Sequence, residues 1–155
     1  MMKNELALAN LTEEDLTGIA TRMAVHSSLP LLIYLQGELG SGKTTFVREW
    51  LRTLGVTGHI RSPSFTLIES YQTVKGTFHH LDLYRLIDPQ ELEFLGFRDY
   101  LLEGCLIEWP TNAENYLPNP DLLISLSYSQ CGTETREFKM QAFTTKGKHL
   151  IEACK

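Results

Sequence analysis

The sequence is poor in cysteine, with Cys105, Cys131 and Cys154 as the three examples in 155 residues. No two of them form a CxxC pair, so neither a disulfide framework nor a zinc site is indicated. We also expect no signal peptide, because acidic residues in MMKNELALANLTEEDL stand where its apolar core would be. The apolar runs are too short to span a bilayer. We therefore expect a cytoplasmic protein without a membrane role.

Positive charge is in deficit, since 14 lysines and arginines face 19 aspartates and glutamates, for a net charge of −5. Such a balance argues against a protein that coats DNA or RNA, which requires a basic surface. Hydrophobic residues make up 43% and charged residues 21%, as in ordinary globular proteins. No repeat, low-complexity tract or linker divides the chain, so we predict a single domain over residues 1–155.

Strand and helix patterns alternate along the chain. Leu31–Gln36 is a short apolar run between Pro30 and Gly37, which predicts a central strand buried on both faces. Apolar residues at helical spacing predict a helix after it, over 42–54. Further helices are predicted from residue 12, over 88–102 and over 147–155, and further strands over 65–72, 76–86, 105–109, 121–129 and 135–143. This order favours an α/β sandwich with a mixed sheet.

Two of these helices have start signals in the sequence. Thr12 is the predicted N-cap of the first helix, with Asp15 as its capping-box partner. Asp88 is the predicted N-cap of the later helix, with Pro89 at the first helical position and Glu91 as capping-box partner. The turn-like segments TVKG and QCGT predict hairpins between the strands beside them.

The segment GELGSGKTTF, Gly37–Phe46, follows the apolar strand and opens the next helix. It matches the pattern GxxxxGK[ST], with Gly37, Gly42, Lys43 and Thr44 in the fixed places. Glycines let backbone N–H groups approach phosphate oxygens, and the positive end of the helix dipole points at the same anion. Lys43 is expected to contact the β- and γ-phosphates, and the Thr44 hydroxyl to coordinate Mg²⁺. The segment therefore predicts binding of a nucleoside triphosphate.

Hydrolysis or transfer of a phosphoryl group requires an acid near the phosphates, and two acids stand at strand ends. Asp82 ends TFHHL, a poor hydrophobic strand because of His79 and His80, and Glu108 ends the more apolar CLI. Ligands of doubly wound sheets gather at the carboxyl ends of strands, so both acids are candidates for holding Mg²⁺ or orienting water. The two histidines have no companions at metal-ligand spacing, which argues against a metal role for them.

Two further segments fit a purely structural role less well. RSPSFTL, Arg61–Leu67, is either a plain strand entry or a loop that closes over the γ-phosphate. As a closing loop it offers three hydroxyl groups, those of Ser62, Ser64 and Thr66. Tyr84 and Arg85 follow the acid of HLD and are either site residues or a core aromatic and a surface arginine.

Five segments in chain order, GELGSGKTTF, SPSFTL, HLDLYRL, ELEFLGFRDYL and IEWP, carry a resemblance to a known family. The chain resembles TsaE, the bacterial P-loop ATPase family formerly called YjeE, over roughly residues 31–118. This resemblance implies a P-loop NTPase fold of three layers around a mixed, mostly parallel sheet. The helix before these segments and the strands after them agree with the family only in general pattern.

The resemblance also implies a function. TsaE proteins take part in making threonylcarbamoyladenosine, a modification beside the anticodon of tRNAs that read codons starting with A. The transferase TsaD, working with TsaB, moves the threonylcarbamoyl group to tRNA, and TsaE binds this pair and hydrolyses ATP, which resets it between turnovers. The expected cofactors are ATP or ADP and Mg²⁺. The expected partners are TsaD and TsaB, with tRNA reached only through that complex.

The resemblance further implies roles for residues of the glycine segment and for the two acids. It places the phosphates in a cradle that consists of Gly37, Gly40, Ser41, Gly42, Lys43, Thr44 and Thr45. Thr44 and Glu108 are expected to hold Mg²⁺, with Asp82 in the Walker-B-like place. Lys43, Asp82 and Glu108 are the expected catalytic residues, and either Glu108 or Asp82 orients the attacking water.

Other positions carry over from the family outside the glycine segment. Ser62–Thr66 corresponds to a switch-like loop, and Trp109 matches a tryptophan that the family uses near its site. Thr12 is the nearest candidate for a contact to adenine. The family usually has threonine where this chain has Ser64, which keeps the hydroxyl and loses a methyl group, so we expect function to survive this difference.

Two other functions compete with this hypothesis. A small P-loop kinase needs an acceptor pocket and usually a lid with several arginines, whereas the segment 86–104 contains Arg98 alone. A GTP-dependent switch usually carries an NKxD segment late in the chain, and TNAEN does not replace it. The kinase remains the alternative, with a small molecule as its acceptor.

Overall fold

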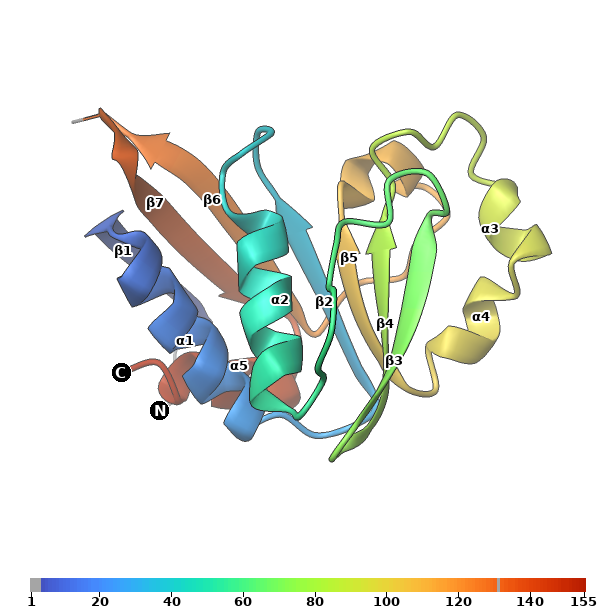
Figure 1. The fold of residues 1–155 in the computed structure, drawn as a ribbon, viewed down its shortest axis with the longest axis horizontal. Helices are drawn as coiled ribbons and strands as arrows, with labels where there is room; N and C mark the ends of the chain where they lie inside the picture. The colour runs from blue at the N-terminus through green and yellow to red at the C-terminus, as the bar shows by residue number, and fades with distance from the viewer. Residues whose placement is uncertain (1–3, 131) are drawn as a thin grey trace.

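In the computed structural model, which describes residues 4–130 and 132–155, the strands form one seven-stranded sheet (Figure 1). The strands are β1 (Glu5–Leu11), β2 (Leu31–Gln36), β3 (Ile68–Thr73), β4 (Gly76–Asp82), β5 (Gly104–Glu108), β6 (Leu122–Ser129) and β7 (Gly132–Ala142). The helices are α1 (Glu13–Val25), α2 (Lys43–Thr53), α3 (Glu91–Phe94), α4 (Phe97–Tyr100), the 3₁₀ helix η1 (Pro110–Ala113) and α5 (Thr145–Glu152). Cys131 and residues 1–3 of the N-terminal segment, which the sequence analysis used, lie outside the described residues.

The strand order is β1-β7-β6-β2-β5-β4-β3, with β2 at the centre. The pairs β2–β5, β2–β6 and β4–β5 are parallel, and the pairs β1–β7, β6–β7 and β3–β4 are antiparallel. The predicted mixed sheet of an α/β fold is therefore confirmed, with its parallel part confined to the four strands from β6 to β4. Leu31–Leu35 of β2 is buried throughout, as a strand covered on both faces requires.

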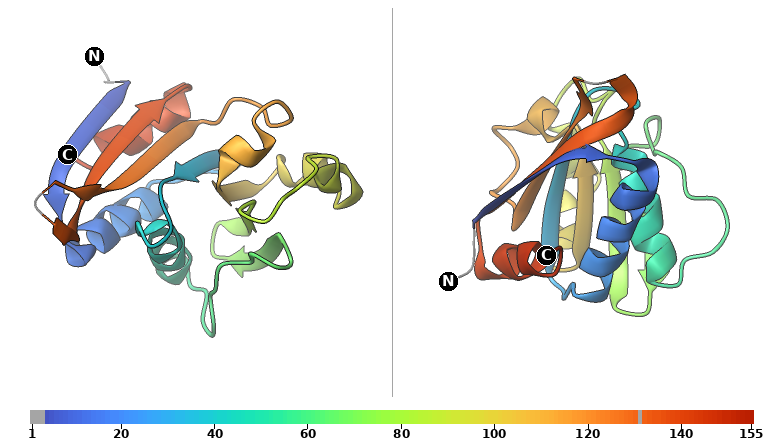
Figure 2. Two further views of the ribbon diagram at one scale, coloured as in Figure 1. Left: turned by 90° about the horizontal axis from the view of Figure 1, so that it is seen from above. Right: turned by 90° about the vertical axis from the view of Figure 1, so that its left-hand side faces the viewer.

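Helices cover the two faces of the sheet and create two hydrophobic cores (Figure 2). The first core packs α1, α2 and α5 against the sheet and includes the large buried side chains of Phe46, Trp50 and Phe138. The second core packs α3, α4 and η1 against the other face of the central strands, with Phe97 and Ile107 at its centre. In the part of the chain that the structure describes, no helix has the length and apolar character needed to cross a membrane.

The start of α1 agrees with the sequence prediction. Thr12 is the N-cap, and its hydroxyl accepts a hydrogen bond from the Asp15 N–H at 3.1 Å. The Asp15 carboxylate accepts one from the Thr12 N–H at 3.0 Å, which completes the capping box. This reciprocal pair fixes the start of α1 at Glu13, the residue after the N-cap.

The single helix predicted over 88–102 is wrong. The structure has two four-residue helices there, α3 and α4, separated at Gly96, whose φ of 74° is left-handed. A left-handed residue interrupts the helical hydrogen bonds, and glycine adopts this conformation without steric cost. The N-cap of α3 is Gln90 rather than Asp88, whose carboxylate instead accepts a hydrogen bond from the Gln90 N–H at 3.0 Å.

The N-terminal strand β1 has no counterpart in the sequence analysis. It pairs with the edge of β7, and most of its side chains are exposed or half-buried. A strand of this kind has no continuous apolar run, so only a weak alternation of Leu6 and Leu8 with smaller residues marks it.

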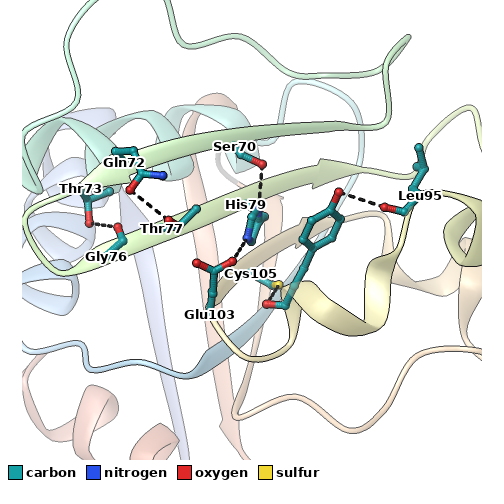
Figure 3. Close-up of polar contacts among 10 residues, drawn as sticks. Ser70, Gln72, Thr73, Gly76, Thr77, His79, Leu95, Glu103 and Cys105 are labelled. Carbon is teal, nitrogen blue, oxygen red and sulfur yellow. Dashed lines mark hydrogen bonds and ion pairs between the residues drawn. The ribbon is translucent and has the colours of Figure 1, made fainter.

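Strand β4 is buried although it contains two histidines, His79 and His80. His79 and His80 point to opposite faces, as neighbouring strand residues do. His79 bonds the Ser70 hydroxyl through Nδ1 at 2.7 Å and the Glu103 carboxylate through Nε2 at 2.9 Å (Figure 3). Its ring centroid lies 4.3 Å from that of Tyr100. Both ring nitrogens of His79 thus have partners, one on β3 and one in the segment between α4 and β5.

Candidate functional site

A cavity of about 910 Å³ opens where the glycine segment after β2 meets the carboxyl ends of β4 and β5. This is the edge at which open α/β sheets bind ligands. Twelve of the residues singled out from the sequence line it: Gly40, Gly42, Lys43, Thr44, Thr45, Ser62, Ser64, Asp82, Tyr84, Arg85, Glu108 and Trp109. Residues far apart in the chain therefore meet at one site.

The glycine segment turns tightly between β2 and α2. Gly40 has φ of 77° and Gly42 has φ of 111°, backbone conformations that residues with a side chain rarely adopt. Gly42 is the N-cap of α2, so the first free N–H groups of that helix face the cavity that Gly42 lines. A Cβ at Gly37 would lie 2.3 Å from the carbonyl oxygen of Leu126, so glycine is required where the segment passes β6. The backbone therefore has the form that an anion cradle needs.

Lys43 places a cation in this cradle while remaining only 4% exposed. Its Nζ donates hydrogen bonds to the carbonyl oxygens of Gly37 at 2.6 Å and Glu38 at 2.9 Å, and lies 4.4 Å from the centroid of the Trp109 ring. Burial lowers the pKa of the Lys43 ammonium, and the carboxylates of Glu108 and Asp82 oppose this shift. The ammonium is held by backbone carbonyls, which a phosphate can replace as its partners.

Asp82 and Glu108 are direct register partners at the ends of the parallel strands β4 and β5. Both are buried, at 4% and 2% exposure. The Thr44 hydroxyl lies 3.0 Å from Glu108 Oε1 and 3.1 Å from Oε2. Asp82 accepts hydrogen bonds from the Ser62 hydroxyl and, at 3.0 Å, from the Tyr84 N–H. The structure thus brings the two predicted acids together, each already oriented by a hydrogen-bonding partner.

His80 joins this group from within the sheet. Its Nε2 lies 2.5 Å from Glu108 Oε2, its side chain is fully buried, and its Nδ1 has no hydrogen-bonding partner among the described residues. This contact between His80 and Glu108 was not predicted from the sequence. The available signal was the strand alternation, which puts Phe78, His80 and Asp82 on one face of β4.

Aromatic and cationic side chains border the cavity beyond the acids. Trp109 has φ of 58° and ψ of 49°, a left-handed conformation, and its ring centroid lies 5.0 Å from that of Tyr84. Arg85 lines the cavity, and its guanidinium lies 4.3 Å from the centroid of the exposed Phe65 ring. Tyr84 and Arg85 therefore both line the cavity, as the first of their two interpretations expected, and a role in function stays a prediction.

Four sequence candidates do not line the cavity with the others. The Thr12 hydroxyl is occupied in the cap of α1, whereas the next residue, Glu13, reaches the cavity. Gly37 lies behind the turn, and the buried Ser41 hydroxyl has no hydrogen-bonding partner among the described residues. Thr66 is exposed and lies outside the lining, unlike Ser62 and Ser64 of the same loop.

Five lining residues were not singled out from the sequence: Glu13, Leu16, Leu39, Glu134 and Arg136. Glu134 and Arg136 belong to β7, the strand most distant from the glycine segment in sequence. The period of two along β7 places Arg136 in line with the buried Phe138 and Met140. An arginine on the core side of a strand was thus the signal available.

The oxygen donors in the cavity suit Mg²⁺. Within residues 4–130 and 132–155, no three histidine, cysteine or acidic side chains are grouped so that they could hold a metal by themselves. Mg²⁺ is usually held by one or two carboxylates together with phosphate oxygens and water. Thr44, Asp82 and Glu108 supply a hydroxyl and two carboxylates on the cavity wall. This donor set fits Mg²⁺ that arrives with the phosphates of a nucleotide.

A buried strand, a glycine turn and a helix N-terminus that face two strand-end carboxylates define the P-loop class of nucleotide-binding folds. The family model described as "Threonylcarbamoyl adenosine biosynthesis protein TsaE" matches residues 10–138, and the chain belongs to this family.

Curated relatives and a solved structure agree with this assignment. The chain is 40% identical to the tRNA threonylcarbamoyladenosine biosynthesis protein TsaE of Haemophilus influenzae over 133 residues, which cover 84% of this chain and 82% of that protein. It is 33% identical to the TsaE of Bacillus subtilis over 150 residues, 96% of this chain and 92% of that protein. A crystal structure of Bacillus subtilis YdiB superposes with a TM-score of 0.75 at 28% identity, covering 99% of this chain and 95% of that one.

Proposed function

We propose that this chain is a Mg²⁺-dependent ATPase, a single P-loop domain that serves threonylcarbamoyladenosine modification of tRNA in the cytoplasm. One observation carries the enzymatic part: Lys43 and Thr44 share a cavity with two buried carboxylates, Asp82 and Glu108. The names of the relatives from Haemophilus influenzae and Bacillus subtilis support the tRNA part.

In this proposal the phosphates bind in the turn from Gly37 to Thr45. Lys43 leaves the carbonyls of Gly37 and Glu38 and pairs with the β- and γ-phosphates, where an ammonium in a buried site stabilises developing charge strongly. Ser62, with Thr66 further along the same loop, closes over the terminal phosphate, and Trp109 borders it from the other side. The start of α1, with Thr12 and Glu13, lies toward the adenosine.

The acids have related roles. Bound Mg²⁺ supplies positive charge to the phosphate oxygens, and Thr44, Glu108 and Asp82 are the residues that would hold it. Glu108, or Asp82 in its place, accepts a hydrogen bond from the attacking water and orients it toward the γ-phosphorus. Removing such a preorganised charge commonly costs about 3 kcal/mol or more of transition-state stabilisation.

We further propose that the ATPase acts on the TsaD–TsaB transferase complex and contacts tRNA only through that complex. Two loops beside the cavity support a protein partner, because Phe65 is 82% and Ile87 is 92% exposed. Exposed large apolar side chains of this kind often belong to interaction surfaces. Phosphate release should therefore accelerate when purified TsaD and TsaB are added, and an unchanged rate would contradict this part.

The experiment that tests the enzymatic part uses the purified chain with ATP and Mg²⁺. We expect calorimetry to record binding, and slow release of inorganic phosphate without any acceptor. Release that depends strictly on a small acceptor molecule would favour a kinase instead. A clear preference for GTP in competition binding would contradict the assignment to ATP, and no uptake of adenine nucleotide would remove its basis.

A further inference from the structure

The β6–β7 hairpin bonds three consecutive carbonyl groups of the glycine turn. The Tyr128 hydroxyl of β6 donates to the Leu39 carbonyl at 3.3 Å. Arg136 of β7 donates from Nη2 to the Gly40 carbonyl at 3.2 Å and from Nε to the Ser41 carbonyl at 2.9 Å. One side of the turn is therefore fixed to the C-terminal strands, which the GxxxxGK[ST] pattern does not include.

The two side chains of this clamp, Tyr128 and Arg136, also support one another. The Arg136 guanidinium lies 4.4 Å from the centroid of the Tyr128 ring, a cation–π distance that favours this arrangement. A Cβ at Gly40 would lie 2.8 Å from the Tyr128 hydroxyl oxygen, so the clamp reaches the turn only because position 40 has no side chain. The planar guanidinium reaches two carbonyls at once, which a lysine ammonium does not match in geometry.

The geometry of the peptide bond links this clamp to phosphate binding. In a trans peptide unit the C=O and the N–H of the next residue point in opposite directions. Carbonyls of Leu39 and Ser41 that point to the hairpin therefore turn the N–H groups of Gly40 and Gly42 away from it. Gly40 and Gly42 both line the cavity, whereas the Ser41 N–H closes the turn by donating to the Glu38 carbonyl at 3.1 Å.

We propose that Tyr128 and Arg136 are positioning residues that hold the glycine turn in its phosphate-binding form before a nucleotide arrives. This inference rests on the proposed function, because it assigns the clamp a purpose only if the cavity binds a polyphosphate. Arg136 also lines the cavity, so the charge it adds there and the hydrogen bonds it donates are two effects to be separated.

Three variants separate these effects in calorimetric titrations with ATP and Mg²⁺. We expect Tyr128→Phe to weaken ATP binding about 3-fold, because it removes one hydrogen bond and keeps the ring. Arg136→Lys keeps the charge and loses the two-carbonyl geometry, so we expect about 10-fold weaker binding. Arg136→Met loses both the charge and the hydrogen bonds to the two carbonyls, so we expect about 30-fold weaker ATP binding.

Matched controls exist elsewhere in the chain. The Tyr100 hydroxyl donates to the Leu95 carbonyl at 3.0 Å, so Tyr100→Phe removes the same type of bond away from the cavity. The Arg98 guanidinium lies 5.8 Å from the Tyr116 ring centroid, so Arg98→Met is the corresponding arginine control. Both controls should bind ATP like the parent chain, within about 1.5-fold, because neither contacts the turn.

A second measurement reports on the turn without nucleotide. Amide hydrogen exchange at Ser41, whose N–H donates to the Glu38 carbonyl, should be faster in all three clamp variants, while exchange in the central strand β2 stays unchanged. Equal ATP affinity in Tyr128→Phe and the parent chain, together with unchanged exchange, would overturn the inference. If the Arg136 variants do not fold, Tyr128→Phe alone decides. Failure of the parent chain to bind ATP would contradict the proposed function instead, and would remove the purpose assigned to the clamp even if exchange changed.

Discussion

The Nε2 atom of His80 lies 2.5 Å from Oε2 of Glu108, and both side chains are buried, at 0% and 3% exposure. The imidazole and the Thr44 hydroxyl together fix the plane of the carboxylate that the proposal places beside Mg²⁺. Mutation of a residue that hydrogen-bonds a metal-binding or catalytic carboxylate commonly lowers metal affinity or activity 10- to 100-fold. The hydrogen bond between His80 and Glu108 therefore links the buried interior of the sheet to the candidate site.

We predict that His80→Phe lowers both stability and turnover. The variant leaves a buried carboxylate without one of its two partners, which should reduce the free energy of unfolding by about 3 kcal/mol. Turnover of ATP should fall about 10-fold because Glu108 loses its fixed orientation. Urea unfolding followed by circular dichroism and phosphate-release kinetics measure the two effects.

His79→Phe is the matched control for this prediction. It removes hydrogen bonds to Ser70 and to the half-exposed Glu103, on the opposite face of the same strand. We expect lower stability with ATP turnover close to that of the parent chain. Equal turnover of His80→Phe and the parent chain would show that Glu108 does not need the imidazole.

A second prediction compares two lysines with similar bonding. Lys43 donates to the carbonyls of Gly37 and Glu38, and Lys75 donates to the carbonyls of Val25 and Ser27, at 2.5 Å each. Only Lys43 lies in the cavity. Lys43→Ala should lower turnover by at least about 100-fold, since it removes the cation at the phosphates.

Lys75→Ala should leave ATP turnover unchanged, although it removes an ammonium with two carbonyl partners. Circular dichroism should show both variants folded. Parent-like phosphate release by Lys43→Ala would contradict the assignment of the site. A similar loss of ATP turnover in both variants would instead indicate that general destabilisation causes it.

A third prediction concerns pH. The hydrogen bond from His79 lowers the pKa of Glu103 below its ordinary value of 4.5. A carboxyl group with a lower pKa in the folded state stabilises the protein above its unfolded pKa, and this contribution is lost as the pH falls through the folded pKa. Glu103→Gln should therefore reduce stability at pH 7, and the difference should vanish at acidic pH below the folded pKa.

Denaturant unfolding of the parent chain and of Glu103→Gln between pH 3 and pH 7 measures this difference. The effect should be small, because the Glu103 side chain is 42% exposed and water screens its interaction. Glu5→Gln, on the outer strand β1, provides an exposed control. A stability difference that grows toward acidic pH would contradict the predicted sign.

The local part of the site was predictable from the sequence. The turn from Gly37 to Thr44 depends on residues that are neighbours in the chain, with an apolar strand before and an amphipathic helix after. Glu108 was predictable because it follows the short apolar segment CLI, and Asp82 because it ends the predicted strand TFHHL in spite of the two histidines there. The order of the strands then brings these two acids together.

The remaining features depend on contacts between distant residues or on one local conformation. Arg136 reaches the glycine turn only because β7 pairs with β6, which in turn pairs with β2. His80 gains its role from the neighbouring strand β5, which supplies Glu108. The break between α3 and α4 depends on one left-handed residue, Gly96, inside a segment with strong start signals for a longer helix.

The last prediction concerns two glycines whose replacement by alanine should have opposite effects. Gly18 lies inside α1, and a Cβ there would meet only the Arg22 guanidinium at 3.6 Å, an ordinary contact. A Cβ at Gly104 would lie 2.4 Å from a ring carbon of Phe78, which is fully buried and packs against Trp50. Gly18→Ala should therefore stabilise the chain by about 0.5–1 kcal/mol.

Gly104→Ala should destabilise it by about 1–3 kcal/mol, because the packed ring cannot move aside without disturbing the first core. Both changes restrict the unfolded chain to the same extent, so the difference between them reports packing in the folded state alone. Guanidinium unfolding of the two variants beside the parent chain measures it. Shifts of the same sign would contradict the close contact between β5 and the Phe78 ring.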